Sequence, residues 1–432
     1  MSNRSNIIIC PDCDLLLPKK KAPLGYSVSC PRCGKRLSKQ KKNSVQRTFV
    51  LSMTGLLMYL PAMLLPLMTF KNLGFSDSAN VIESIVNFYK NDYYFVSLMV
   101  LLSSAVFPLL LLAMVCTISF NLQHGRYPSY LRTLFRNYLH LEEWAMIEVY
   151  LLGIMITIIK MVDSSEIVYH SGVFCFTSLV LLSLAISTTI DKQYFWQLIE
   201  SKGRLNNSEA EVLPAHLPET TTGLQQQLTL CHICEKVVSI THAGKQCPRC
   251  GANIHSRIPG SIAKTWALVL TSILLIIPAN LLPIMEIDFL GVPDKSTILD
   301  GIIYFFQHGS FFIGLVIFTA SILVPLFKII GLSILLVSTR PCAARFLRNK
   351  TIMYRFIAFI GRWSMLDIFV IALLTVLVDF GFFTSIHTAP AATYFCLVVA
   401  CTMFAAITFD PRIMWDDCSK IQQNSTLNKY QP

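Results

Sequence analysis

Long apolar runs alternate with shorter polar segments along most of this 432-residue chain. Each run is long enough to cross about 30 Å of hydrocarbon as a helix that rises about 1.5 Å per residue. The runs lie near residues 48–70, 93–120, 143–162, 171–190, 262–285, 311–338, 355–379 and 389–408. This pattern predicts an all-α polytopic membrane protein.

Polar segments divide these runs into two groups of four, and each group follows a segment rich in cysteine, lysine and arginine. We therefore predict two tandem transmembrane modules of four helices, each preceded by a small cytoplasmic zinc ribbon. The predicted boundaries are 1–46 and 224–261 for the ribbons, 47–191 and 262–409 for the transmembrane modules, 192–223 for a linker and 410–432 for a cytoplasmic tail.

The second group repeats the first. A Pro-Ala-x-Leu-Leu-Pro motif at residues 61–66 recurs at 278–283, an offset of 217 positions. The segment Trp144–Glu148 recurs as Trp363–Asp367, an offset of 219 positions. A nearly constant offset over most of each half indicates a tandem duplication.

Composition agrees with a membrane protein. Hydrophobic residues make up 53% of the chain, charged residues make up 14%, and the mean hydropathy is +0.55. The net charge is +11, but the basic residues lie in blocks beside apolar runs, which argues against nucleic-acid binding.

Charge also predicts the orientation in the membrane. Basic residues near a span are retained in the cytoplasm, whereas the loops near 71–92 and 163–170 are acidic and are expected outside. An even number of crossings then leaves both termini in the cytoplasm. No apolar stretch directly follows the first methionine, so we expect no cleavable signal peptide.

Eight of the 14 cysteines form Cys-x-x-Cys pairs, two pairs in each polar segment. In a reducing compartment such pairs are more typical of metal binding than of disulfides, and four thiolates suit a tetrahedral zinc ion. Iron in a rubredoxin-like site and reversible thiol oxidation are the alternatives. The predicted ligands of two structural zinc ions are Cys10, Cys13, Cys30 and Cys33, and Cys231, Cys234, Cys247 and Cys250.

Some charged residues fall inside apolar runs, where charge is costly and indicates function. Lys328 and Asp367 lie on neighbouring runs at similar predicted depths, and Thr402 on the last run adds a hydroxyl. In the first half Glu148 replaces Asp367, but Leu111 replaces Lys328. A static ion pair and a proton-sensitive switch are both open interpretations.

Lys160 and Asp163 form a second candidate pair at the outer end of the third run, three positions apart on one helical face. A solvated interfacial pair is the alternative. The sequence contains no phosphate-binding loop, nucleophile elbow or His-Glu-x-x-His helix, so we expect no enzyme. Any work must then come from a gradient or a partner.

Taken together, the Cys-x-x-Cys pairs, the repeated Pro-Ala-x-Leu-Leu-Pro motif and the segment Gly361–Asp367 resemble the paraquat-inducible protein A family of Gram-negative inner-membrane proteins. The resemblance extends from Cys10 to about Trp415. It implies a protein that works with a periplasm-spanning tunnel of mammalian-cell-entry (MCE) domains in moving lipid between the inner and outer membranes. It also implies that Lys328, Asp367 and Thr402 belong to one polar network.

The function expected from these observations is loading or unloading of phospholipid at the foot of a periplasmic conduit, coupled to protonation of the intramembrane cluster. A membrane-bound redox or metal stress sensor is one alternative, and it requires thiols that oxidise reversibly. A small-solute exporter that needs no periplasmic partner is another.

Overall fold

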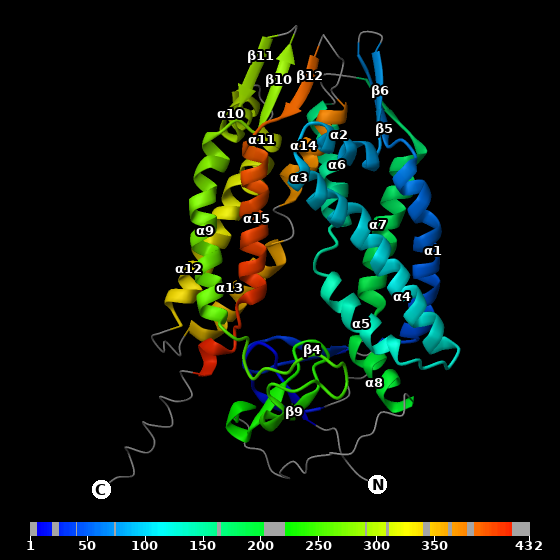
Figure 1. Ribbon diagram of the computed structural model, residues 1–432, viewed down its shortest axis with the longest axis vertical. Helices are drawn as coiled ribbons and strands as arrows, with labels where there is room; N and C mark the ends of the chain where they lie inside the picture. The colour runs from blue at the N-terminus through cyan, green and yellow to red at the C-terminus, as the bar shows by residue number, and fades with distance from the viewer. Residues whose placement is uncertain are drawn as a thin grey trace.

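A computed structural model of the chain describes residues 7–19, 26–39, 41–72, 75–161, 166–202, 221–289, 292–307, 311–339, 346–361, 365–377 and 384–416. The protein is mostly helical. Two helical halves stand side by side, short strands project at one end, and a compact pair of cysteine-rich modules lies at the other (Figure 1).

The first half follows the order of the sequence. Its helices are α1 (Ser44–Leu64), α2 (Val81–Lys90), α3 (Tyr94–Val100), the π-helical turn η1 (Leu101–Val106), α4 (Phe107–Gln123), α5 (Tyr130–Leu141), α6 (Ile147–Met161), α7 (Ser171–Thr189) and α8 (Lys192–Lys202).

The second half repeats this order with only small differences. Its helices are α9 (Ser261–Leu281), α10 (Ile298–Gln307), α11 (Phe311–Phe318), the π-helical turn η4 (Thr319–Leu323), α12 (Val324–Val337), α13 (Leu347–Ile360), α14 (Leu366–Leu377) and α15 (Ala391–Thr408). The shared order of elements, π turns included, supports the duplication inferred from the sequence.

Among the residues that the structure describes, six helical segments are long and apolar enough to cross a membrane. They are Ser44–Leu64, Tyr94–Gln123, Ser171–Thr189, Ser261–Leu281, Gly314–Val337 and Ala391–Thr408. They confirm a multi-pass membrane protein, because six of the predicted runs form long apolar helices.

The third run of each half differs from the prediction. The run 143–162 forms α6, which has only 15 residues and is separated from α5 by a break. The run 355–379 covers the end of α13 and the whole of α14, with Gly361 and Met365 outside both α-helices. A helix that crosses the hydrocarbon alone needs about 20 residues, and no α-helix among the described residues of these two runs reaches that length.

The break before α6 has a cause in the π turn η1. Phe107 donates its N–H to Leu102 O, five positions back. The same spacing would pair Ser103 O with Pro108, which has no N–H. Ser103 O instead accepts a hydrogen bond from the N–H of Met146 at 3.2 Å. This contact fixes the backbone just before α6 to a neighbouring helix.

Two small antiparallel sheets lie at the end opposite the cysteine modules, and the sequence did not predict them. One has the order β6-β5-β7 and the other the order β11-β10-β12. In each half, the hairpin that follows the first long helix pairs with a strand that precedes the last long helix. The strands are β5 (Met68–Asn72), β6 (Phe75–Ala79), β7 (Glu166–Tyr169), β10 (Met285–Phe289), β11 (Val292–Ser296) and β12 (Thr384–Thr388).

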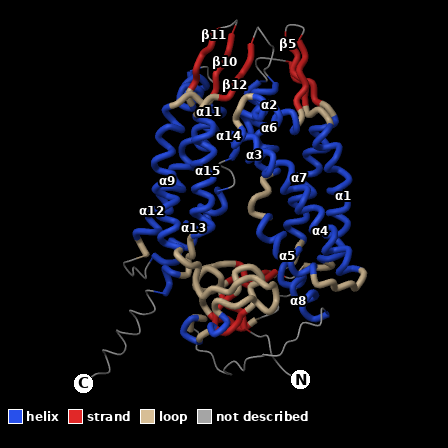
Figure 2. The backbone as a smooth tube through the Cα atoms, in the orientation of Figure 1, coloured by secondary structure: helices blue, strands red, loops and turns tan. Residues whose placement is uncertain are grey.

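The cysteine modules, residues 7–19 with 26–39 and residues 221–257, consist mainly of loops with short hairpins (Figure 2). We call them the N module and the C module. Their strands are β1 (Ile7–Ile9), β2 (Leu16–Pro18), β3 (Ser27–Ser29), β4 (Arg36–Lys39), β8 (Leu228–Leu230) and β9 (Val237–Ser239), with the short helices η2 (Leu224–Gln226) and η3 (Ile240–His242).

Within the helical region the halves meet mainly where α14 packs against α6 and α2. Tyr150 on α6 contacts Phe369 on α14, with ring centroids 5.2 Å apart. Trp144, beside the break, contacts Phe404 on α15 at 4.9 Å. One buried cluster therefore contains residues from both halves.

Candidate functional site

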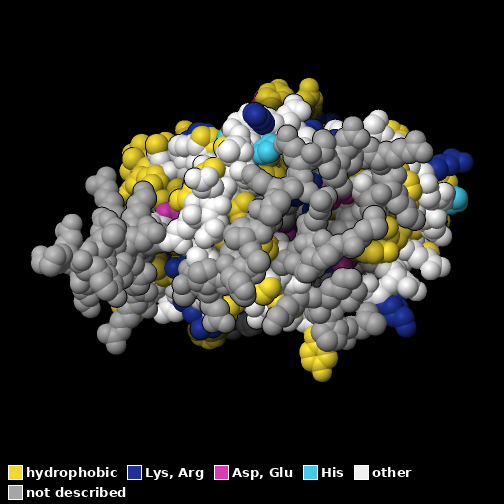
Figure 3. Space-filling model, turned by 90° about the horizontal axis from the view of Figure 1, so that it is seen from below, with side chains coloured by type: hydrophobic (Ala, Val, Ile, Leu, Met, Phe, Trp, Pro, Cys, Tyr) yellow, Lys and Arg dark blue, Asp and Glu magenta, His cyan; other side chains and the backbone are white. Residues whose placement is uncertain are grey.

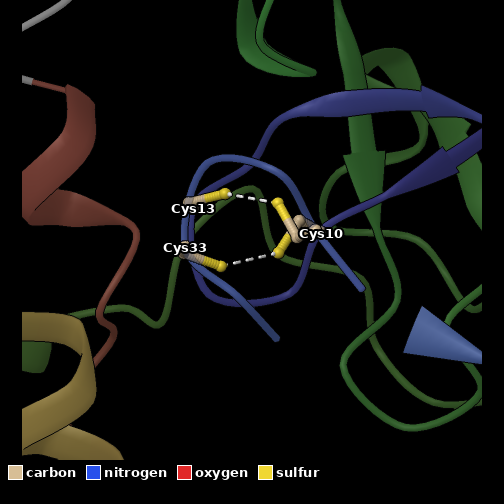
Figure 4. A group of neighbouring side chains, drawn as sticks. Cys10, Cys13 and Cys33 are labelled. Atoms are coloured by element: carbon tan, nitrogen blue, oxygen red, sulfur yellow. Dashed lines mark hydrogen bonds between the residues drawn. The ribbon is translucent and has the colours of Figure 1, made fainter. Parts of the chain in front are cut away.

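The cysteines of each module converge on one point. All Sγ atoms within each group of four lie within 4.8 Å of one another, and all eight side chains are buried. In the N module Cys10 and Cys33 are 3.4 Å apart, and Cys13 and Cys30 are 3.6 Å apart (Figure 4). Each group of four cysteines thus surrounds a position that could hold a metal ion.

This geometry fits a tetrahedral metal ion. Zn–S bonds of about 2.3 Å place the sulfurs of a tetrahedral site roughly 3.8 Å apart. The spacings are close to that value and are too long for a disulfide bond.

Two members of the predicted intramembrane cluster are fully buried. Lys328 on α12 and Thr402 on α15 have no exposed surface, and α12 packs against α15. Thr402 donates its hydroxyl hydrogen bond to Val399 O in its own helix. Glu148 lies in the first turn of α6 and is half-buried.

The other predicted members fall outside the described side chains. Asp367 is the second residue of α14 and Lys160 lies in the last turn of α6, but their side chains are not among those described. Asp163 lies outside the described residues altogether. The helix that carries Asp367 packs mainly on α6 and α2, whereas α12 packs on α9, α13 and α15. The pairing of Lys328 with Asp367 therefore remains a prediction.

An apolar pocket lies where the two halves meet, near the end that carries the sheets. Its volume is about 60 Å³, and its mouth is partly open. Ser321 on η4 and Thr297 before α10 are the polar residues of an otherwise apolar wall, and the hydroxyl of Thr297 donates to Asp300 Oδ2 at 2.7 Å. The wall also includes Ile156 from α6, Gly301 and Phe305 from α10, and Leu366 and Val370 from α14.

The equivalent positions of the first half are more fully buried. Ser84 and Phe88, the equivalents of Gly301 and Phe305 at an offset of 217, are almost completely buried. Helix α14 of the second half packs on α2, the helix that carries them.

Comparison with protein families matches residues 45–200 and 262–419 to the model of paraquat-inducible protein A. The chain belongs to this family. Both halves match the same model, which confirms the internal duplication as well as the resemblance seen in the sequence.

Curated relatives extend over nearly the whole length of this family member. The intermembrane transport protein PqiA of Escherichia coli K12 is 32% identical over 410 residues, 95% of each chain. The lipophilic envelope-spanning tunnel protein A of the same organism is 31% identical over 407 residues, 94% of this chain and 90% of that protein. A probable intermembrane transport protein of Haemophilus influenzae is 27% identical over 417 residues, 95% of each chain. No solved structure matches the chain.

Sequence reasoning missed the residues that form the pocket in this member of the paraquat-inducible protein A family. Its wall comes from segments far apart in the sequence, and most of its side chains are ordinary membrane residues. One weak signal is present in the repeat itself. Gly301 and Ala320 replace Ser84 and Ser103 of the first half, so two smaller or less polar side chains occur where the pocket forms.

Proposed function

We propose that this protein moves phospholipid between the inner and outer membranes, and that the pocket receives an acyl chain during loading. The family membership and the relatives named as intermembrane transport proteins confirm the predicted role in intermembrane transport. This proposed site rests on an apolar pocket at the junction of the two halves, whose wall includes only two polar residues, Thr297 and Ser321. Apolar pockets with few polar groups are typical of small-molecule binding sites.

A pocket-filling variant tests this site. A Cβ atom added at Gly301 meets nothing within 4 Å, so Gly301→Leu fills pocket space without striking the backbone. We expect phospholipid co-purified in mild detergent to fall severalfold per mole of protein, measured by mass spectrometry. Leu274→Phe, at a position on α9 that is 69% exposed, is the control and should keep its lipid. Equal lipid content in Gly301→Leu and wild type would exclude this pocket.

The proposed topology places both termini and both cysteine modules in the cytoplasm of a Gram-negative cell, with the protein in the inner membrane. Viewed from the end that carries the modules, Lys and Arg side chains lie around the rim and few acidic side chains are visible (Figure 3). Positive charge at one end supports a cytoplasmic location for that end. The proposed division is two modules of four crossings, 47–191 and 262–409, each following a ribbon, with 192–223 as linker and 410–432 as tail.

The proposed partner is a periplasmic MCE-domain protein, which would receive the lipid. Mild-detergent purification from cells that express both proteins should recover them together. Recovery of the transporter with lipid but without the MCE-domain protein would support a different acceptor. Activity in membranes that lack the MCE-domain protein would favour the small-solute exporter.

Zinc is the proposed metal in both modules. The thiolates of Cys10, Cys13, Cys30 and Cys33 would hold one ion and those of Cys231, Cys234, Cys247 and Cys250 another, which would cross-link each module. Four thiolates leave no open position for substrate, so the role of the ion is structural. Elemental analysis of the purified protein should give about two zinc ions per chain. Iron at that stoichiometry, or thiols that cycle with oxidant and hold no metal, would favour the sensor function.

A further inference from the structure

The two cysteine modules lie across from the halves to which they are covalently joined. The N module leads into α1 of the first half, but its cysteines share a buried cluster with residues of α9, α12, α13 and α15. The C module leads into α9 of the second half, but its cysteines share the cluster that contains the first-half core. Each module therefore contacts the opposite half as well as its own, to which it is bound by contacts such as His232 with Arg412 and Leu37 with Gln193.

The N module binds the second half through charged groups. Arg355 on α13 donates from Nε to Asp12 Oδ2 at 2.6 Å and from Nη2 to Cys33 O at 3.0 Å. The guanidinium of Arg32 lies 4.3 Å from the ring centroid of Trp415, just after α15. Because the guanidinium of Arg355 is planar and donates to two separate acceptors, these contacts fix its orientation as well as its distance.

The C module binds the first half in the same way. Glu200 on α8 forms ion pairs with Lys236 and Arg249, both at 2.6 Å. Burial raises the pKa of Glu200, but these two cations lower it by more, so the net pKa lies below its usual value. Arg136 on α5 donates from Nη1 to Cys250 O at 3.5 Å.

Two of these contacts are copies of each other. Arg136 and Arg355 are equivalent at an offset of 219, and Cys33 and Cys250 are equivalent at an offset of 217. Each arginine donates to the carbonyl of the last cysteine in the module that precedes the other half. A crossed contact that appears in both copies is a feature of the architecture rather than of one surface loop.

The modules are also joined to each other. Leu16 N–H donates to Thr221 O at 3.0 Å, and Gly223 N–H donates to Asp14 O at 2.8 Å. The buried carboxylate of Asp14 pairs with Arg257 at 2.9 Å, and Arg257 also pairs with Asp416 beyond α15. The modules therefore form one connected unit that contacts both halves.

We propose that the paired modules are a crossed coupling that sets the relative orientation of the two halves. Arg136 and Arg355 lie on α5 and α13, the helices directly before the breaks, and the helices directly after the breaks, α6 and α14, pack together. A displacement of either broken crossing is passed through the modules to the other half. The two arginines are positioning residues in this coupling.

The distance between the halves tests the proposal in the full-length protein. Spin labels attached to non-canonical amino acids at Tyr89 on α2 and Tyr304 on α10, both well exposed, avoid the cysteines. We expect double electron–electron resonance to give a shifted or broader distance distribution in Arg136→Met/Arg355→Met than in wild type. The measurement involves no bound lipid, so its result is independent of the Gly301→Leu test.

The control removes an ion pair that does not cross between halves. Lys192 and Glu142, 2.6 Å apart, both belong to the first half, and Lys192→Met should leave the distribution unchanged. Hydrogen exchange over residues 30–39 verifies that the arginine variants release the N module. Faster exchange there with an unchanged distance distribution would overturn the coupling, as would an equal change in Lys192→Met.

If the Arg136→Met/Arg355→Met variant does not fold, exchanging the charges of Asp12 and Arg355 provides a second test. Arg355→Asp alone should shift the distribution, and Asp12→Arg combined with Arg355→Asp should return it towards wild type. Absence of this rescue in a folded protein that retains its metal would also overturn the proposal.

Discussion

Two buried serines mark the duplication at the scale of single residues. Ser44, at the beginning of α1, donates its hydroxyl hydrogen bond to Thr189 O at 2.7 Å and accepts one from the N–H of Asp191 at 3.0 Å. One side chain thus satisfies both a helix carbonyl at the end of α7 and an amide beyond it. It ties the first and last long helices of the half together.

The equivalent residue of the second half gives a prediction. Ser261 donates to Thr408 O at 2.8 Å and accepts from Asp410 N–H at 2.9 Å. Ser261→Ala leaves both partners unpaired in a buried site, which costs about 1–3 kcal/mol. We expect a lower melting temperature in detergent by differential scanning fluorimetry. Ser187→Ala, whose hydroxyl bonds an exposed carbonyl of its own helix, should change it little, and equal effects would contradict this account.

Lys328 belongs to the same scale, because its amine lies in a fully buried position on a membrane helix. We expect that Lys328→Met, which keeps most of the side-chain volume, leaves the melting temperature unchanged or raises it, since replacing a buried charge is often neutral or stabilising. If protonation drives lipid transfer, transfer of fluorescent phospholipid to the MCE-domain acceptor from proteoliposomes should fall to background.

The neighbour of Lys328 provides the control. Phe327→Met alters a partly lipid-exposed side chain on the same turn and should transfer lipid normally. Full transfer by Lys328→Met, with a lower melting temperature, would instead identify a static pair that fixes helix packing. Asp367→Asn, measured in the same way, tests the proposed partner.

Sequence predicted some residues of the candidate sites and not others for a physical reason. Metal-binding cysteines come in local pairs whose spacing reflects one tight turn, so Cys30 and Cys33 indicate a site without any knowledge of the fold. Ser261 and Gly301 owe their importance to partners that arrive from elsewhere in the chain. No local pattern distinguishes them from other small residues of a membrane helix.

At the scale of elements, hydropathy located the long helices but not their ends. The first predicted run ended at residue 70, whereas α1 ends at Leu64 and the apolar residues continue into strand β5. Hydropathy does not separate a helix from a buried strand. It also remains high through the breaks, because Ala145 and Met146 are as apolar as the helices around them.

The break before α6 depends on Pro108, and this dependence is testable. Pro108→Ala supplies an N–H that can pair with a carbonyl of η1 and so compete with Met146 N–H for Ser103 O. Loss of a hydrogen bond of about 1.4 kcal/mol raises local amide exchange about tenfold. We expect this increase over residues 146–150 by hydrogen-exchange mass spectrometry. Pro128→Ala, in the loop before α5, should have no effect there, and an unchanged rate in Pro108→Ala would refute the explanation.

At the scale of the whole molecule, the sequence predicted two similar units but not how they are joined. The crossed position of the cysteine modules rests on contacts between segments more than 100 residues apart, such as Arg136 with Cys250 and Arg355 with Asp12. A repeat alone is equally compatible with each module lying under its own half. Folding therefore requires both halves before either module has its full set of contacts.

The second junction between the halves, where α6 meets α14, gives the last prediction. A Cβ atom at Gly153 would lie 3.2 Å from Phe369 Cβ and 3.6 Å from its backbone carbon, so Gly153→Leu must push the helices apart. Overpacking of this kind costs typically about 1–3 kcal/mol. We expect a lower melting temperature and a longer distance between labels at Tyr89 and Tyr304. Gly301→Leu makes the same substitution where a Cβ meets nothing within 4 Å and should leave the melting temperature nearly unchanged. An equal loss of stability in both variants would show that the α6–α14 contact is not a close junction between the halves.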